Sequence, residues 1–299
     1  MPDSTGLKPE NAATLRRYYD KVNQGDFLGV AETLAPEAVF TIAGDTGLLP
    51  FAGAWSGRDR VVELLRAFEA AFWVVDMTEV RTLSQPNTAV SFNDEAFKVK
   101  TTGQYYRVGV VHRVEFGDDG LIRSLTNVHD TYPAVQAFGG EPAIVEAMPL
   151  PDPLPGEEEH DGAAAKAVAE ALVAGIRSGD DVSGLFDDRA IVFVPGDQDV
   201  LPIAGAWVER EEISELLSRS RQFFSDRQST TALTAAQAGS VGIQTEESAT
   251  LPDGRRAIFD QYLLAQVGAS GKIGRLTYYL DTYPLAGRAN SDLAKGAAR

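Results

Sequence analysis

The spacing of apolar residues changes once along the first half of the chain, from a helical period to a strand period. Apolar side chains recur three or four positions apart in 11–22 and in 58–72, which predicts two helices, and 27–34 predicts a shorter one. From residue 74 onward apolar residues alternate with polar ones, as in half-buried strands. This alternation predicts a run of four strands after one short strand at 38–42, over 74–83, 89–100, 104–116 and 121–132.

Helices followed by a run of strands are typical of the α+β class. We expect about three N-terminal helices packed on one face of a curved antiparallel sheet. A sheet and helices arranged in this way enclose a cone, and an apolar cone interior is a natural pocket for a small molecule.

The same pattern occurs twice in the chain. The segment FAGAW at 51–55 returns as IAGAW at 203–207, and DTYP at 130–133 returns at 281–284. The offset between the copies is 152 residues for the first segment and 151 for the second, and at 151 Glu95 matches Glu246. A period this long predicts two whole domains rather than a solenoid.

The two expected domains cover 9–138 and 163–287. Between them, 139–162 is rich in proline and glutamate, with alternate prolines at Pro149, Pro151, Pro153 and Pro155. Alternate prolines favour an extended polyproline conformation, so we interpret this segment as a semi-rigid linker. The tail at 288–299 is short and polar, and we expect it to be flexible.

Composition narrows the function classes. The 299 residues carry 43 Asp and Glu against 27 Lys and Arg, a net charge of −16, which disfavours nucleic acid and anionic membranes as partners. There is no cysteine, which excludes disulfides and thiol chemistry, and the three histidines lack metal-ligand spacing. We therefore expect no metal and no cofactor. The polar N-terminus and the lack of a long apolar run favour a cytoplasmic protein.

Three segments of the first copy carry a resemblance to a known family. The segment RYYDKVNQGD at 17–26 resembles the first helix of ketosteroid isomerases and their relatives, and 44–57 resembles the loop before their third helix. The DTYP segment at 130–133 fits the family's last strand. Both copies are thus similar to the SnoaL-like branch of the nuclear transport factor 2-like superfamily. The resemblance implies two cone domains that pair through their sheets as an intrachain pseudo-dimer.

The resemblance also implies positions for a site. In ketosteroid isomerases a tyrosine on the first helix and a protonated aspartate on a later strand donate to the substrate oxyanion, and an aspartate on the first strand is the base. These positions fall on Tyr18, His112 and Ile42 here, so the family's base is missing. The second copy departs at all three positions, with Leu172, Leu263 and Val194. We therefore expect the first domain to be active and the second to have a degenerate site.

Strand parity supports His112 independently. In 104–116 it shares a face with the apolar Val108, Val110 and Val114, which points to the cavity side. Histidine suits proton transfer near neutral pH, although a buried structural histidine would give the same pattern. Asp45 is a candidate second carboxylate, and a turn-forming aspartate is the alternative. Candidate substrate contacts are Trp55, Phe40, Val110 and Trp207.

The leading functional hypothesis is a cofactor-independent cyclase or isomerase that transfers protons on a hydrophobic, carbonyl-containing small molecule of the polyketide or steroid type. In it, His112 is the general acid/base, Tyr18 is the oxyanion donor and Asp45 is a second carboxylate. The alternative is a non-catalytic binding protein for an apolar metabolite, and a structural protein with filled cones is a third hypothesis. Self-association through the sheets is compatible with each.

Overall fold

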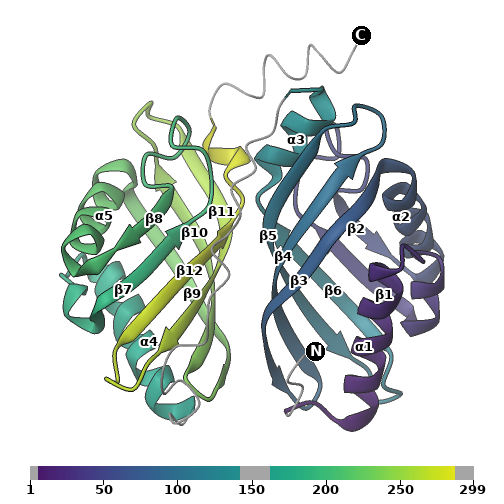
Figure 1. Ribbon diagram of the computed structural model, residues 1–299, viewed down its shortest axis with the longest axis horizontal. Coiled ribbons are helices and arrows are strands. Elements are labelled where there is room, and N and C mark those ends of the chain that lie inside the picture. The colour runs from purple at the N-terminus through teal and green to yellow at the C-terminus, as the bar shows by residue number, and fades with distance from the viewer. Residues whose placement is uncertain (1–5, 142–161, 287–299) are drawn as a thin grey trace. The chain divides into compact units, whose positions relative to one another are not determined.

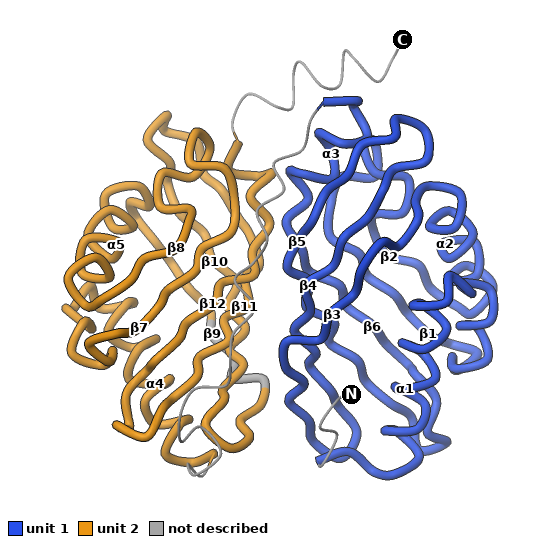
Figure 2. The backbone as a smooth tube through the Cα atoms, in the orientation of Figure 1, with its two compact units in different colours: residues 1–150, 288–299 blue, residues 151–287 orange. Residues whose placement is uncertain are grey.

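The computed structural model describes residues 6–141 and 162–286 (Figure 1). These residues form two compact units, one from each range, and each unit is described by itself (Figure 2). Apart from 139–141 and 162, the expected linker lies outside the described residues, and so does the tail at 288–299. None of the described helices has the length and apolar content needed to cross a lipid bilayer.

The first unit opens with helices and continues into strands. Helix α1 buries one stripe of side chains that includes Leu15, Tyr18 and Val22, which is why the helical period is visible in the sequence. The elements in chain order are α1 (Pro9–Asn23), η1 (Gly29–Thr33), β1 (Leu34–Ile42), β2 (Gly53–Ser56), α2 (Arg58–Ala71), β3 (Phe72–Gln85), β4 (Thr88–Val99), β5 (Tyr105–Phe116), β6 (Ile122–His129) and α3 (Thr131–Gly139).

The six strands of the first unit form one curved sheet with the order β2-β1-β6-β5-β4-β3. Helices α1 and α2 lie on one face of it (Figure 1). The strands β3 to β6 form the expected antiparallel meander, but β1 pairs with β6 in parallel, so the sheet is mixed rather than wholly antiparallel. The reason lies in the strand directions. After α2 the chain enters β3 in the same direction as β2, which is antiparallel to β1. The three turns from β3 to β6 each reverse the direction, so β6 runs parallel to β1.

Two local expectations need correction. The strand expected at 121–132 ends at His129, because the Asp130 carboxylate accepts a hydrogen bond from the backbone N–H of Tyr132 at 3.1 Å and caps α3. The loop before the third helix, expected within 44–57, contains the short strand β2, which pairs with β1. Four residues are too few for alternation to show in a sequence.

The second unit repeats the first. Its sheet has the order β8-β7-β12-β11-β10-β9, which is the same arrangement with each strand replaced by its counterpart. The expected α+β class with two tandem cone domains is therefore confirmed. The elements are α4 (Gly162–Ser178), η3 (Ser183–Leu185), β7 (Phe186–Val194), β8 (Gly205–Val208), α5 (Glu209–Phe223), β9 (Ser225–Gln237), β10 (Ser240–Thr250), β11 (Arg256–Val267), β12 (Ile273–Leu280) and η4 (Tyr283–Leu285).

Candidate active site and a second cavity

The cone of the first unit is walled mainly by aromatic rings. The Phe72 ring lies 5.1 Å from the rings of both Phe51 and Phe97, measured between centroids. These contacts leave a cavity of about 60 Å³. Small-molecule pockets usually hold about 300 Å³ or more, so side chains of this wall must move to admit a substrate of several rings.

A chain of hydrogen bonds closes the polar end of this cavity. Because β5 pairs with β6 so that His112 lies opposite Asn127, their side chains share the cavity face. His129 Nδ1 lies 2.6 Å from Asn127 Oδ1, and Asn127 Nδ2 lies 2.9 Å from His112 Nε2. His112 Nδ1 in turn lies 3.2 Å from the Tyr19 hydroxyl. With the amide in this orientation, each group donates to the next, and His112 carries its proton on Nδ1.

Both histidines of this hydrogen-bonded series, His112 and His129, are neutral at ordinary pH. Burial lowers the pKa of His112 to about 3, and the neighbouring His129 lowers it further. Burial also lowers the pKa of His129 to about 4. The low dielectric of the interior disfavours the imidazolium form, and no carboxylate offsets this at neutral pH. His112 is therefore a weak base held in a fixed orientation.

Glu95 is the acidic group of the cavity. It lies on β4 opposite Met77 of β3 and Val108 of β5. Burial raises its pKa to about 8, and the negative charge of Asp94 adds to this shift. Its Oε1 atom lies 3.9 Å from His112 Nε2 and has no hydrogen-bond partner among the described residues. Since burial keeps both groups neutral, the two do not form an ion pair at neutral pH.

Tyr18 supplies a second polar group next to Glu95. Its ring meets that of His112 edge-on, with centroids 6.4 Å apart, and it lines the cavity. Burial raises its pKa well above the usual value, and the charges of Tyr19 and Glu95 raise it further, so the phenol stays protonated. Within the described part of the chain the Tyr18 hydroxyl has no hydrogen-bond partner. This hydroxyl is therefore a candidate donor to a ligand in the cavity that Tyr18 lines.

The structure brings together four of the residues singled out from the sequence. The cavity is lined by Tyr18, His112, Phe40 and Val110. For His112 and Val110 this agrees with the strand parity of β5. Asp45 does not join them, because it is exposed and its carboxylate accepts the backbone N–H of Gly47 at 2.7 Å. Asp45 thus follows the turn-forming alternative.

The two tryptophans also lie outside the cavities. Trp55 Nε1 donates to the carbonyl oxygen of Phe51 at 3.1 Å, and Trp207 Nε1 donates to that of Ile203 at 2.9 Å. Neither indole is among the residues that line the cavities of the two units. Their recurrence in the two copies therefore reflects a repeated anchor for the loop before α2 and α5, and we correct their placement as substrate contacts.

Sequence reasoning missed Glu95, Asn127 and the Tyr19 contact. Glu95 has the same strand parity as the apolar Phe97, so alternation within 89–100 does contain the signal that a carboxyl lies on the cavity face. Nothing in the spacing alone indicates that Asn127 joins the two histidines. That contact depends on the register between β5 and β6.

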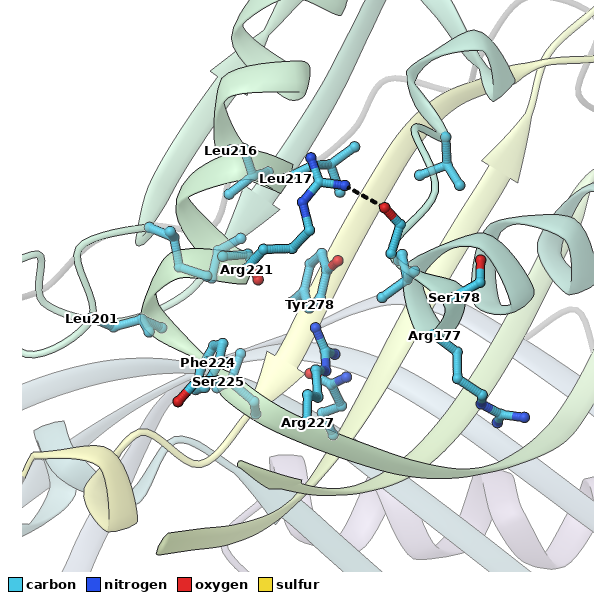
Figure 3. Close-up of a pocket in the computed structure, with 18 of the residues that line it drawn as sticks. Arg177, Ser178, Leu201, Leu216, Leu217, Arg221, Phe224, Ser225, Arg227 and Tyr278 are labelled. Atoms are coloured by element: carbon cyan, nitrogen blue, oxygen red, sulfur yellow. Dashed lines mark hydrogen bonds between the residues drawn. The ribbon is translucent and has the colours of Figure 1, made fainter. Parts of the chain in front are cut away.

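The second unit contains a larger cavity, of about 300 Å³. The positions equivalent to Ile42 and His112 are apolar there, as expected, with Val194 and Leu263 lining this hollow and its small extension. Polar groups enter from other elements instead. Figure 3 shows Arg227 and Tyr278 among the residues that line it. The described residues of the chain contain no group of three or more His, Asp or Glu side chains arranged to bind a metal ion.

The family model of the SnoaL-like domain matches residues 15–125, which form most of the described part of the first unit. The first unit is thus a SnoaL-like domain, and the second unit repeats its strand order. The match to the SnoaL-like family therefore lies in the first unit, and the second unit is related to it by the repeated strand order and the repeated motifs.

Several solved structures are similar to part of the chain. A putative isomerase from Rhodopseudomonas palustris is 20% identical, with 42% of this chain and 94% of that chain covered and a TM-score of 0.39. A steroid Δ-isomerase from Pseudomonas aeruginosa is 22% identical, with coverage of 44% and 88% and a TM-score of 0.34. TerC, crystallised with polyporic acid, is 16% identical, with coverage of 43% and 98% and a TM-score of 0.38. No curated protein matches the chain.

Proposed function

We propose that the first unit is a cofactor-independent isomerase or cyclase that transfers a proton on a hydrophobic, carbonyl-containing small molecule of the polyketide or steroid type. One observation carries this proposal. The Glu95 carboxyl and the Tyr18 hydroxyl face the same apolar cavity, and neither is hydrogen-bonded to a described residue. Polar groups buried without partners are costly, so their persistence at a cavity supports a role toward a ligand.

In the proposed reaction Glu95 is the base and Tyr18 is the oxyanion donor. Ionised Glu95 removes a proton from the carbon next to the substrate carbonyl, and the electron pair of that C–H bond moves toward the carbonyl oxygen. The Tyr18 hydroxyl donates to this oxygen as negative charge develops on it. In an isomerase Glu95 returns the proton to another carbon. In a cyclase the enolate carbon attacks a second carbonyl carbon of the same molecule, the C–O π bond of that carbonyl opens, and the resulting alkoxide takes the proton from Glu95.

The pKa of Glu95 suits this role better than that of His112. A general base is most effective when its pKa lies near the working pH, and Glu95 has a pKa of about 8 against about 3 for His112. His112 instead orients Tyr19 through its Nδ1 proton and packs against the Tyr18 ring. We therefore assign the acid/base role to Glu95 and make His112 a positioning residue.

Hydrogen–deuterium exchange at carbon tests the proposal without knowledge of the natural substrate. We would incubate the full chain with 2-tetralone in D₂O and follow loss of the proton signal next to the carbonyl by NMR. We expect Glu95→Gln and Tyr18→Phe each to reduce the enzyme-dependent rate by about 100-fold. Asp45→Asn, which removes an exposed turn carboxylate, is the matched control and should match the wild type. Exchange that is no faster than buffer, or unaffected by Glu95→Gln, would refute the proposal.

A second candidate function is non-catalytic binding of an apolar metabolite. It is favoured by the hydrogen-bonded state of His112, both of whose ring nitrogens already have partners. This alternative predicts that 2-tetralone binds to the first unit without exchange. Its binding would be affected little by Glu95→Gln.

A further inference from the structure

The cavity of the second unit contains a cation, Arg227, that a buried carboxylate holds in place. Arg227 Nε donates to Glu247 Oε2 at 2.7 Å, and the Glu247 side chain is only 2% exposed. Gln261 Nε2 donates to the other carboxylate oxygen, Oε1, at 3.1 Å. Among the described residues the two terminal nitrogens of Arg227 have no hydrogen-bond partner. The fork of the guanidinium is therefore available to a ligand.

Regular alternation in β9 places Arg227 on the cavity face, because it shares that face with Ser229, which lies opposite Glu247. In the pairing of β9 with β10, Ser225 lies opposite Thr250 and Gln228 opposite Ser248, so two residues of β9 face the single Ala249. This bulge lies where β9 begins, and Phe224, Ser225 and Asp226 line the cavity together with Arg227. Asp226, within the bulge, has a φ of 47°, a left-handed conformation that is costly for a residue with a side chain.

Glu247 is the structural counterpart of Glu95. Glu95 lies opposite Val108, four residues before His112, and Glu247 lies opposite Phe259, four residues before Leu263. The match of Glu95 to Glu246 expected from the repeat is thus shifted by one residue. The same carboxyl position is unpaired in the first unit and anchors an arginine in the second.

The other side chains of this cavity define the shape of its ligand. Tyr278 lines it and has no hydrogen-bond partner among the described residues, so its hydroxyl is a second donor. The apolar lining includes Leu201, Leu216 and Leu217, and the guanidinium carbon of Arg227 lies 5.9 Å from the centre of the Phe224 ring (Figure 3). Arg221 lines the cavity as well, and its guanidinium donates to the carbonyl oxygen of Gly179 at 3.0 Å.

We infer that the second unit is a binding site for an apolar, ring-containing small molecule with a carboxylate or enolate group, which Arg227 and Tyr278 hold. A guanidinium fork binds two oxygens of a planar anion in parallel, which a neutral alcohol or ketone cannot match. Glu247 is a positioning residue that fixes the fork through Nε. The other charged residues that line the site are Asp180, Asp226, Arg177 and Arg221, so their charges cancel in number. The preference for an anion therefore comes from the guanidinium of Arg227 and not from the net charge of the site.

Calorimetric titration of the full chain with 1-naphthoate tests this inference, with 1-naphthalenemethanol as the neutral analogue of the same shape. We expect naphthoate to bind at least 10-fold more tightly than the alcohol. Arg227→Gln should abolish this difference and leave the affinity for the alcohol within about two-fold. Arg256→Gln removes an arginine that bonds Ser248 on the surface of the same unit, and it should leave both affinities unchanged. Glu95→Gln should also leave them unchanged, which separates this site from the first unit.

Arg227→Gln leaves Glu247 buried without its cation and can unfold the second unit. The double variant Arg227→Gln/Glu247→Gln removes both charges and avoids this penalty. We expect it to fold, as judged by circular dichroism, and to bind naphthoate as weakly as the alcohol. Equal binding of naphthoate and alcohol by the wild type, or undiminished naphthoate binding by the folded double variant, would overturn the inference.

Discussion

The buried titratable groups of the first unit predict a particular dependence of its stability on pH. Burial raises the pKa of Glu95 from 4.5 to about 8, so between these values the folded state holds a proton that the unfolded state has lost. Stability therefore falls as pH rises through this window. His112 and His129 act oppositely. Their pKa values are lowered from 6.5 to about 3 and about 4, so below pH 6.5 the unfolded state binds more protons and stability falls as pH drops.

The magnitude follows from the number of protons exchanged. One proton contributes about 1.4 kcal/mol per pH unit. Between pH 4.5 and 6.5 the two histidines outweigh Glu95, and stability rises with pH. Between pH 6.5 and 8 only Glu95 among these three groups differs between the two states, so the free energy of unfolding falls by about 2 kcal/mol. We predict a maximum near pH 6.5 for the wild type, and no decline above it for Glu95→Gln.

Tryptophan fluorescence during urea unfolding measures this change in the first unit alone. Trp207→Phe leaves Trp55 and Trp73 as reporters, and both belong to the first unit. The comparison is between this background with and without Glu95→Gln at pH 6.5 and pH 8. The two proteins should differ in their response to pH by about 2 kcal/mol. An equal response of both would show that Glu95 is ionised in the folded state at pH 6.5, and the reasoning about its burial would be refuted.

Three further predictions concern the fold. Phe72→Ala should destabilise the first unit by about 3–5 kcal/mol, measured by urea unfolding, because Phe72 joins the aromatic wall. Asp130→Ala should cost about 1 kcal/mol in the same assay through loss of the α3 cap, and Asp130→Asn should restore most of it. The pairing of the two units through their sheets stays a prediction. Sedimentation of the separately expressed units, alone and mixed, tests it, and failure of the mixture to form a complex counts against it.

The sequence predicted the fold well where one face of an element is buried and the other is solvated. The helix α1 and the strand β5 show clear periods for this reason, and the parity of β5 placed His112 and Val110 on the cavity face. The parallel pairing of β1 with β6 was not predictable in the same way. Periodicity says which face of a strand is buried and says nothing about its neighbour in the sheet.

The candidate site was harder to predict because its strongest group lies on a strand that is buried on both faces. Every residue of β4 from Ala89 to Glu95 is buried, so exposure alternates only over the last residues of the strand, and the parity that Glu95 shares with Phe97 is the single sign of its position. Arg227 was missed for another reason. The first half of β9, from Ser225 to Thr231, contains no apolar residue, so alternation gives no sign of which of its side chains face the cavity.

The equivalence of Glu95 and Glu247 leads to a last prediction. Both glutamates occupy the same strand position, and only Glu247 has a cation within hydrogen-bond distance. Arg227→Gln should therefore convert the second unit to the behaviour of the first, in which a buried, unpaired carboxyl takes up a proton on folding. The stability of the second unit should then decline as pH rises above neutrality.

Trp55→Phe/Trp73→Phe leaves Trp207 as the single tryptophan and reports on the second unit. In this background we expect Arg227→Gln to cost about 3–5 kcal/mol at pH 8 and less at pH 6, because protonation of Glu247 relieves the unpaired charge. Adding Glu247→Gln should remove the pH dependence. A loss of stability in Arg227→Gln that is the same at both pH values would mean that Glu247 stays ionised without its partner. The difference between the two units would then lie in the solvation of this strand position rather than in the arginine.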